Sequence, residues 1–70
     1  MPPAARAELR AWRRKALRRA KAGKAASVPF VAEHIPPTLA AAIIGALEEC
    51  RSPDDVRAVF DSLLEEAAGA

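Results

Sequence analysis

Cysteine, histidine, glycine and aromatic residues are all scarce in this 70-residue sequence. A single cysteine, Cys50, excludes an internal disulfide and a cysteine-rich zinc site. With three glycines, the chain has no glycine-rich phosphate-binding loop. The longest uncharged apolar run, Leu39 to Leu47, has nine residues, far short of the ~20 that cross a bilayer. The first residues, Met-Pro-Pro-Ala, are not the apolar core of a signal peptide, so we expect no membrane segment.

Positive charge is concentrated at one end of the chain. Residues 1–24 contain nine of the eleven Lys and Arg and one acid, Glu8, which gives this segment +8. Residues 25–70 contain two Arg and eight acids, which gives −6, although the whole chain carries only +2. Such a division between the halves of a chain points towards an anionic partner for the basic end.

A basic helix is predicted from about Ala4 to Lys21, because Ala, Leu, Arg and Lys dominate there and are strong helix formers. Gly23 is well placed for the left-handed conformation that ends many helices. The predicted apolar stripe comprises Ala5, Leu9, Trp12, Ala16 and Ala20. It is thin, since only Leu9 and Trp12 in it are large. We therefore expect this helix to be the least stable one unless an anion, from the chain itself or from a partner, covers it.

Residues 25–37 predict an extended connector. Three prolines, Pro29, Pro36 and Pro37, each hold the preceding residue away from helical conformation. A second helix is predicted from about Pro37 or Thr38 to Cys50, since its apolar residues recur with helical spacing.

The third predicted helix has the clearest start signal. Ser52 is a good N-cap, Pro53 suits the first helical position, and Asp55 completes a short capping box. Gly69 ends this helix. The apolar stripes of the second and third helices match, and a two-residue turn separates them, which predicts an antiparallel αα-hairpin. Its predicted core is Leu39, Ile43, Leu47, Val56, Phe60 and Leu63.

The predicted fold is therefore all-α, with three helices in one small domain. It comprises a basic N-terminal helix (residues 1–24), an extended Pro-containing connector (residues 25–37) and an αα-hairpin (residues 38–70). A domain of this size buries only about 60% of the surface that its unfolded chain exposes, so its stability is marginal.

The arginine-rich helix is the main candidate for a binding site. Four arginines follow at i+4 spacing, Arg6, Arg10, Arg14 and Arg18, so their like charges oppose the helix unless anions neutralise them. Phosphates of DNA or RNA, or an acidic protein surface, are possible external sources of those anions. The internal source is the glutamate pairs of the hairpin, Glu48, Glu49, Glu65 and Glu66. The predicted anion or nucleic-acid contacts are Arg10, Arg13, Arg14, Arg18, Arg19 and Lys21.

Three large apolar residues, Trp12, Phe30 and Ile44, are predicted to face a partner. Ile44 lies off the buried stripe of its helix, and Trp12 could stack on a base, although it also belongs to the only apolar stripe of the basic helix. His34 and Cys50 have no acid or cysteine at a recognised metal or catalytic spacing. We therefore predict no enzyme activity, no metal site and no cofactor.

Several short elements occur together between Glu8 and Phe60. They are Glu8-Leu9-Arg10-x-Trp12-x-Arg14-Lys15-Ala16-Leu17, Gly23-Lys24, Val28-Pro29-Phe30, Glu33-His34-Ile35-Pro36 and Arg51-Ser52-Pro53-Asp54-Asp55-Val56-Arg57-Ala58-Val59-Phe60. In about three quarters of its length the chain thus resembles a segment at the C-terminal end of some tailed-phage portal or head-morphogenesis proteins. The resemblance implies virion assembly or DNA packaging, in the host cytoplasm or the virion, and no active site.

The leading functional prediction is a non-enzymatic protein-interaction module, derived from a phage, that assists head or portal assembly. Its partners would be other head or portal subunits or further copies of itself. The alternative is a small nucleic-acid-binding or regulatory protein whose arginine-rich helix grips the phosphates of DNA or RNA.

Overall fold

The computed structural model describes residues 2–24 and 30–69, and the side chains as far as Glu66. The described residues contain three helices and no strand, which confirms the predicted all-α fold. The helices are α1 (Pro3–Ala20), α2 (Pro37–Glu49) and α3 (Pro53–Gly69). Residues 25–29 of the predicted connector lie outside the described residues.

Local signals in the sequence set the helix ends. Gly23 adopts the expected left-handed conformation (φ 72°), and its N–H donates to the Ala20 carbonyl at 3.0 Å. The Lys24 N–H donates to the Arg19 carbonyl at 2.9 Å, which completes a Schellman motif. At the start of α3, the Asp55 N–H donates to Ser52 Oγ at 3.3 Å, and the Asp55 carboxylate accepts from the Arg51 N–H at 2.9 Å. This is a variant of the predicted capping box, displaced by one residue.

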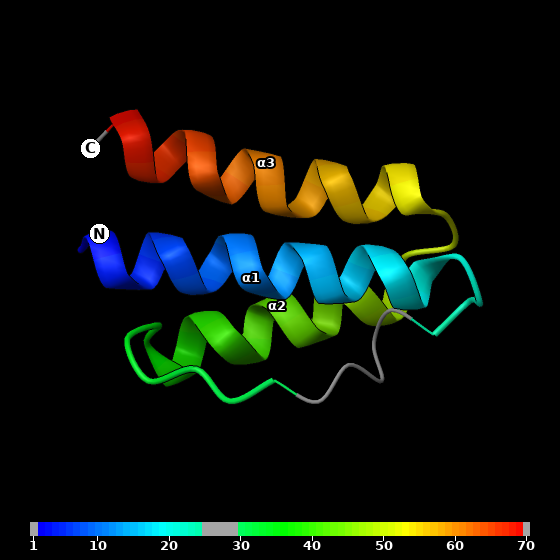
Figure 1. The fold of residues 1–70 in the computed structure, drawn as a ribbon, viewed down its shortest axis with the longest axis horizontal. Coiled ribbons are helices and arrows are strands. Elements are labelled where there is room, and N and C mark those ends of the chain that lie inside the picture. Colours follow the sequence, from blue (N-terminus) through cyan, green and yellow to red (C-terminus); the bar gives the residue numbers. More distant parts are fainter. Residues whose placement is uncertain (1, 25–29, 70) are drawn as a thin grey trace.

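All three helices lie roughly along the long axis of the molecule (Figure 1). α1 and α2 run in the same direction, and α3 runs antiparallel to both. α2 and α3 form the predicted hairpin through a short turn, but the most extensive contact in the fold is between α1 and α3. The basic helix is therefore part of the packed unit and not an arm beside the hairpin.

The thin stripe of α1 forms half of the core. Ala5, Leu9, Trp12, Ala16 and Ala20 are each at most 7% exposed. The remaining buried residues are Ile35, Ile43, Leu47, Val56 and Phe60. Small alanines let the α1 backbone approach its neighbours closely, so few large side chains are needed to fill the contact. The stripe is therefore buried along the whole of α1 although it is thin, and the low stability expected for this helix stays a prediction.

Candidate functional site: a basic helix face and an apolar groove

Trp12 fixes the middle of α1 between the connector and α3. Its ring stacks on Phe30 with centroids 5.1 Å apart and meets Phe60 at 5.9 Å in a tilted arrangement. Lys15 Nζ lies 5.3 Å from the centroid of the Phe30 ring, at cation–π distance. Trp12 is only 2% exposed, so the prediction that it faces a partner is wrong. Phe30 is half-buried against the core, and its contact with a partner stays a prediction. The three aromatic rings pack together and join α1 to the connector and to α3.

Glu8, the single acid of the basic segment, fixes the connector to α1. Its carboxylate accepts the backbone N–H groups of Glu33 (3.0 Å), His34 (2.9 Å) and Ile35 (3.1 Å). His34 Nδ1 lies 3.0 Å from the same carboxylate, so the proton of this hydrogen bond is on Nδ1. We call this arrangement the Glu8 clip. It places Ile35 in the core immediately before α2 begins.

The Glu8 clip also determines the charge state of its carboxylate. Desolvation by the connector acts to raise the pKa of Glu8, but the hydrogen bonds from His34, Glu33 and Ile35 favour the ionised form. The hydrogen bonds outweigh desolvation and hold the pKa of Glu8 at about 2, against an ordinary value of 4.5. Glu8 is therefore engaged as an anion by the connector and does not neutralise the arginines of its own helix.

Four of the six predicted anion contacts lie together, three on α1 and one, Lys21, directly after its last residue. At ~100° per residue, Arg10, Arg14, Arg18 and Lys21 fall within about 80° of the helix circumference, on the side away from the buried stripe. All four side chains are exposed, and we call them the basic row. Arg19 is also exposed but falls on the other flank of the helix.

Arg13 lies apart from the basic row and forms an ion pair within the fold. It is half-buried beside the apolar stripe, and its Nε pairs with Asp61 Oδ1 of α3 at 3.1 Å. This contact connects α1 with α3 at the edge of their interface. Arg13 is therefore already engaged within the chain and is a poorer candidate than the basic row for an external anion.

The basic row has no internal counter-ion in the part of the chain that the structure describes. Arg13–Asp61 is the one ion pair there between α1 and α3, and none involves the glutamates proposed as internal anions, Glu48, Glu49, Glu65 and Glu66. Neighbouring arginines at i+4 oppose the helix by about 0.2–0.5 kcal/mol per pair. That repulsion is left for an external anion to relieve.

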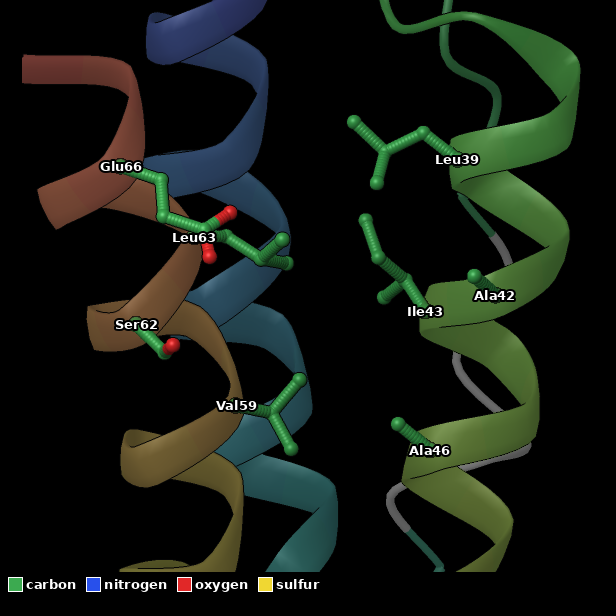
Figure 2. A pocket seen from close by; sticks show the side chains of 8 residues that line it. All are labelled: Leu39, Ala42, Ile43, Ala46, Val59, Ser62, Leu63 and Glu66. Atoms are coloured by element: carbon green, nitrogen blue, oxygen red, sulfur yellow. The ribbon is translucent and has the colours of Figure 1, made fainter. Parts of the chain in front are cut away.

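An apolar groove separates one edge of α2 from α3. Its lining side chains are Leu39, Ala42, Ile43 and Ala46 of α2 and Val59, Ser62, Leu63 and Glu66 of α3. Figure 2 shows side chains of Leu39 and Ile43 pointing towards those of Val59 and Leu63 across the gap. The groove is open to solvent, with a volume of about 180 Å³. This is below the 300–1,000 Å³ of typical small-molecule sites, so the groove better suits side chains of another protein.

The groove exists because α1 occupies the centre of the α3 stripe. Val56 and Phe60 are fully buried, and Trp12 of α1 packs against Phe60. α2 contacts only the edge of the apolar stripe of α3, and Leu39 and Leu63 are therefore only half-buried. Of the predicted hairpin core, Ile43, Leu47, Val56 and Phe60 are buried, whereas Leu39 and Leu63 pack only at its edge, because α3 has a second neighbour that the prediction did not give it.

One carboxylate lines the groove, and two others lie beyond its far end. Glu66 lines the end near Leu39, and none of the described residues that line the groove is basic. Glu49 and Asp55 lie close to Cys50, one helical turn beyond Ala46, at the end near the α2–α3 turn. Burial raises the pKa of the Cys50 thiol, and the charges of Asp55 and Glu49 raise it further. The groove is thus apolar along most of its length, with Glu66 at one end and the carboxylates near Cys50 one helical turn beyond the other. The raised pKa makes the Cys50 thiol poorly suited to act as a nucleophile.

The remaining predicted residues do not converge on a catalytic or metal site. The His34 ring is engaged by the Glu8 clip, and no group of three potential metal ligands occurs among the described residues. Ile44 is 44% exposed, as expected for a partner face, but it does not line the groove. No helix in the described part of the chain is long and apolar enough to cross a membrane.

Two features of the site were missed at the level of sequence. The Glu8 clip joins Glu8 to residues that are 25 to 27 positions further along the chain, so no local pattern indicates it. The one signal in the sequence was that Glu8 is a lone acid among nine basic residues. The groove depends on how three apolar stripes share their contacts, which spacing along one helix does not specify.

Comparison of the chain with protein-family models, with curated proteins and with solved structures gives no match.

Proposed function

We propose that the chain is a non-enzymatic interaction module that binds one helix of a partner protein in the groove between α2 and α3. The observation that carries this proposal is the solvent-open groove with Leu39, Ile43, Val59 and Leu63 facing one another. Amphipathic helices bind such grooves through apolar residues spaced three and four apart.

The charges at one end of the groove and beyond the other specify the partner helix further. Asp55 and Glu66 are eleven residues apart on α3, about 16 Å along its axis at ~1.5 Å per residue. A helix with an apolar stripe of about three turns and a Lys or Arg at each end would match the groove in both shape and charge.

A second copy of the chain is a less suitable occupant. Joining two grooves face to face would bring Glu66, Glu49 and Asp55 of one copy towards the same acids of the other. The basic helix of another copy does not fit either, because its apolar stripe is already buried.

The assembly of a phage head or portal is the cellular context that we propose for this interaction. It is supported by the sequence elements between Glu8 and Phe60, which the fold uses in the Trp12 contacts, the Glu8 clip and the α3 cap. In that context the partner helix would belong to another head or portal subunit.

Photocrosslinking at two neighbouring alanines tests the proposal. Ala42 lines the groove and Ala41 does not, yet both are exposed, so a photoreactive residue at position 41 is a matched control. In the cells that produce the protein, position 42 should give an adduct to one basic amphipathic segment, identified by mass spectrometry, and position 41 should not. The Leu63→Glu substitution should abolish this adduct. Equal adducts at both positions, or an adduct to a second copy of the chain, would contradict the proposal.

A further inference from the structure

We infer that the basic row of α1 is a second, separate binding site, which contacts the phosphates of duplex nucleic acid without reading the bases. The basic row comprises Arg10, Arg14, Arg18 and Lys21, and it spans about 16 Å of helix at ~1.5 Å per residue. The inference does not depend on the groove between α2 and α3.

The first argument is that the row is held in a fixed arrangement by the fold. The opposite face of α1 is buried from Ala5 to Ala20, and Trp12 is packed between Phe30 and Phe60. The Schellman motif at Gly23 ends α1 at Ala20, and Lys21 at its C-cap keeps helical backbone angles. The cations are thus displayed on a rigid element before any ligand arrives, which lowers the entropic cost of binding.

The second argument is that the like charges of the row repel one another and have no counter-ion among the described residues. Arg10, Arg14 and Arg18 are one i+4 step apart, and none forms an ion pair with another described residue. Glu8, the one acid on the same helix, is occupied by the connector. An external polyanion would remove the repulsion and release its own condensed counter-ions.

The third argument distinguishes nucleic acid from an acidic protein. Protein interfaces usually contain a desolvated centre with large apolar or aromatic anchors. The exposed large apolar residues of the described chain are Val31 and Ile44, and neither lies on α1. Next to the row, Ala7 is exposed and Ala11 is half-buried, and the one large apolar neighbour, Leu17, is half-buried against the core. A strongly positive surface without apolar anchors is typical of contacts with a phosphate backbone.

The burial of Trp12 further favours a duplex over a single strand. Proteins that bind single strands without sequence preference stack the bases on exposed aromatic rings. Trp12 is the one aromatic residue of α1, and it is only 2% exposed. Contacts to phosphates alone position a protein on a duplex but carry no sequence information, so we expect binding that is independent of sequence.

Fluorescence anisotropy with labelled oligonucleotides tests this inference. The full chain should bind 20-base-pair duplexes of unrelated sequence with similar affinity. The plot of log K against log salt should have a slope of up to about −3.6 if all four cations neutralise phosphates. The Arg14→Glu plus Arg18→Glu variant should bind at least about 10-fold more weakly at low salt, with a slope less steep by about 1.8.

The control carries the same change in charge away from the row. Arg51→Glu plus Arg57→Glu alters two exposed arginines at the turn and on α3, and it should change the affinity less than about 3-fold. Circular dichroism should show that both variants remain helical. Equal losses in the two variants would overturn the inference, because net charge alone would then account for binding. Preference for a single strand of equal charge, or equal binding of polyglutamate, would also overturn it.

Discussion

Replacing Trp12 with alanine tests whether α1 belongs to the core. The ring is 2% exposed and contacts both Phe30 and Phe60, so truncation removes a fully buried side chain and two aromatic contacts. Such truncations cost about 3–5 kcal/mol. The whole 70-residue chain has a free energy of unfolding of only about 3.5–10 kcal/mol at ~0.05–0.15 kcal/mol per residue. We therefore expect the Trp12→Ala variant to lose a large part of its stability.

Helix propensity alone predicts the opposite change in the free energy of unfolding, so the measurement distinguishes the two explanations. Alanine is a better helix former than tryptophan, so an α1 that did not pack on the core would be unchanged or slightly stabilised. With an m-value of about 1 kcal/mol/M in urea, a loss of ~3 kcal/mol lowers the unfolding midpoint by about 3 M.

Urea unfolding followed by circular dichroism at 222 nm is the suitable assay, because Trp12 is the only tryptophan and its fluorescence is lost with it. Ile44→Ala on the exposed face of α2 is the control and should cost less than about 1 kcal/mol. If Trp12→Ala does not fold, Trp12→Phe keeps one ring and should give a measurable intermediate loss. A loss below about 1 kcal/mol for Trp12→Ala would refute the packing described for α1.

Two further predictions concern hydrogen bonds at either end of the molecule. The stabilisation from the Glu8 clip should be complete above pH 4.5, the ordinary pKa of a glutamate, and lost as the pH falls through the folded pKa of about 2. The difference in thermal midpoint between the natural chain and Glu8→Gln should therefore shrink from pH 6 to pH 2.5, and a constant difference would argue against the clip. Ser52→Ala removes the acceptor of the Asp55 N–H and should cost about 0.5–2 kcal/mol in urea unfolding. Ser62→Ala, which removes no hydrogen bond recorded among the described residues, is its control and should cost less.

Features encoded by adjacent residues could be predicted from the sequence. The bounds of all three helices lie within one residue of expectation, because Pro3, Gly23, Pro37, Ser52 and Pro53 act on the backbone next to them. The buried stripe of α1 was also identified correctly as Ala5, Leu9, Trp12, Ala16 and Ala20. Periodicity therefore identified the face that each helix buries.

The choice of neighbour for each buried face could not be predicted in the same way. Judged by spacing alone, the apolar stripe of α3 could pack against α1 or α2 equally well. Only the three-dimensional structure shows that Phe60, at the centre of that stripe, contacts α1. The size of the side chains in a stripe was a poor guide to how extensively the helix packs. Each alanine buries little area but allows the backbones to approach closely. These two facts explain why the groove was missed and why Trp12 was assigned to a partner face.

The packing of α1 against α3 has a consequence for how the chain folds. Arg13 and Asp61 are 48 positions apart, whereas the αα-hairpin requires closure of only a short turn. Contacts of such long range must form against the entropy of closing the intervening chain, and they slow folding in comparison with purely local helical hairpins. The hairpin that is easiest to recognise in the sequence thus lacks half of its eventual core until α1 arrives. We expect the rate-limiting step to be the meeting of the two ends of the chain, with α2 and α3 remaining only loosely associated until that step.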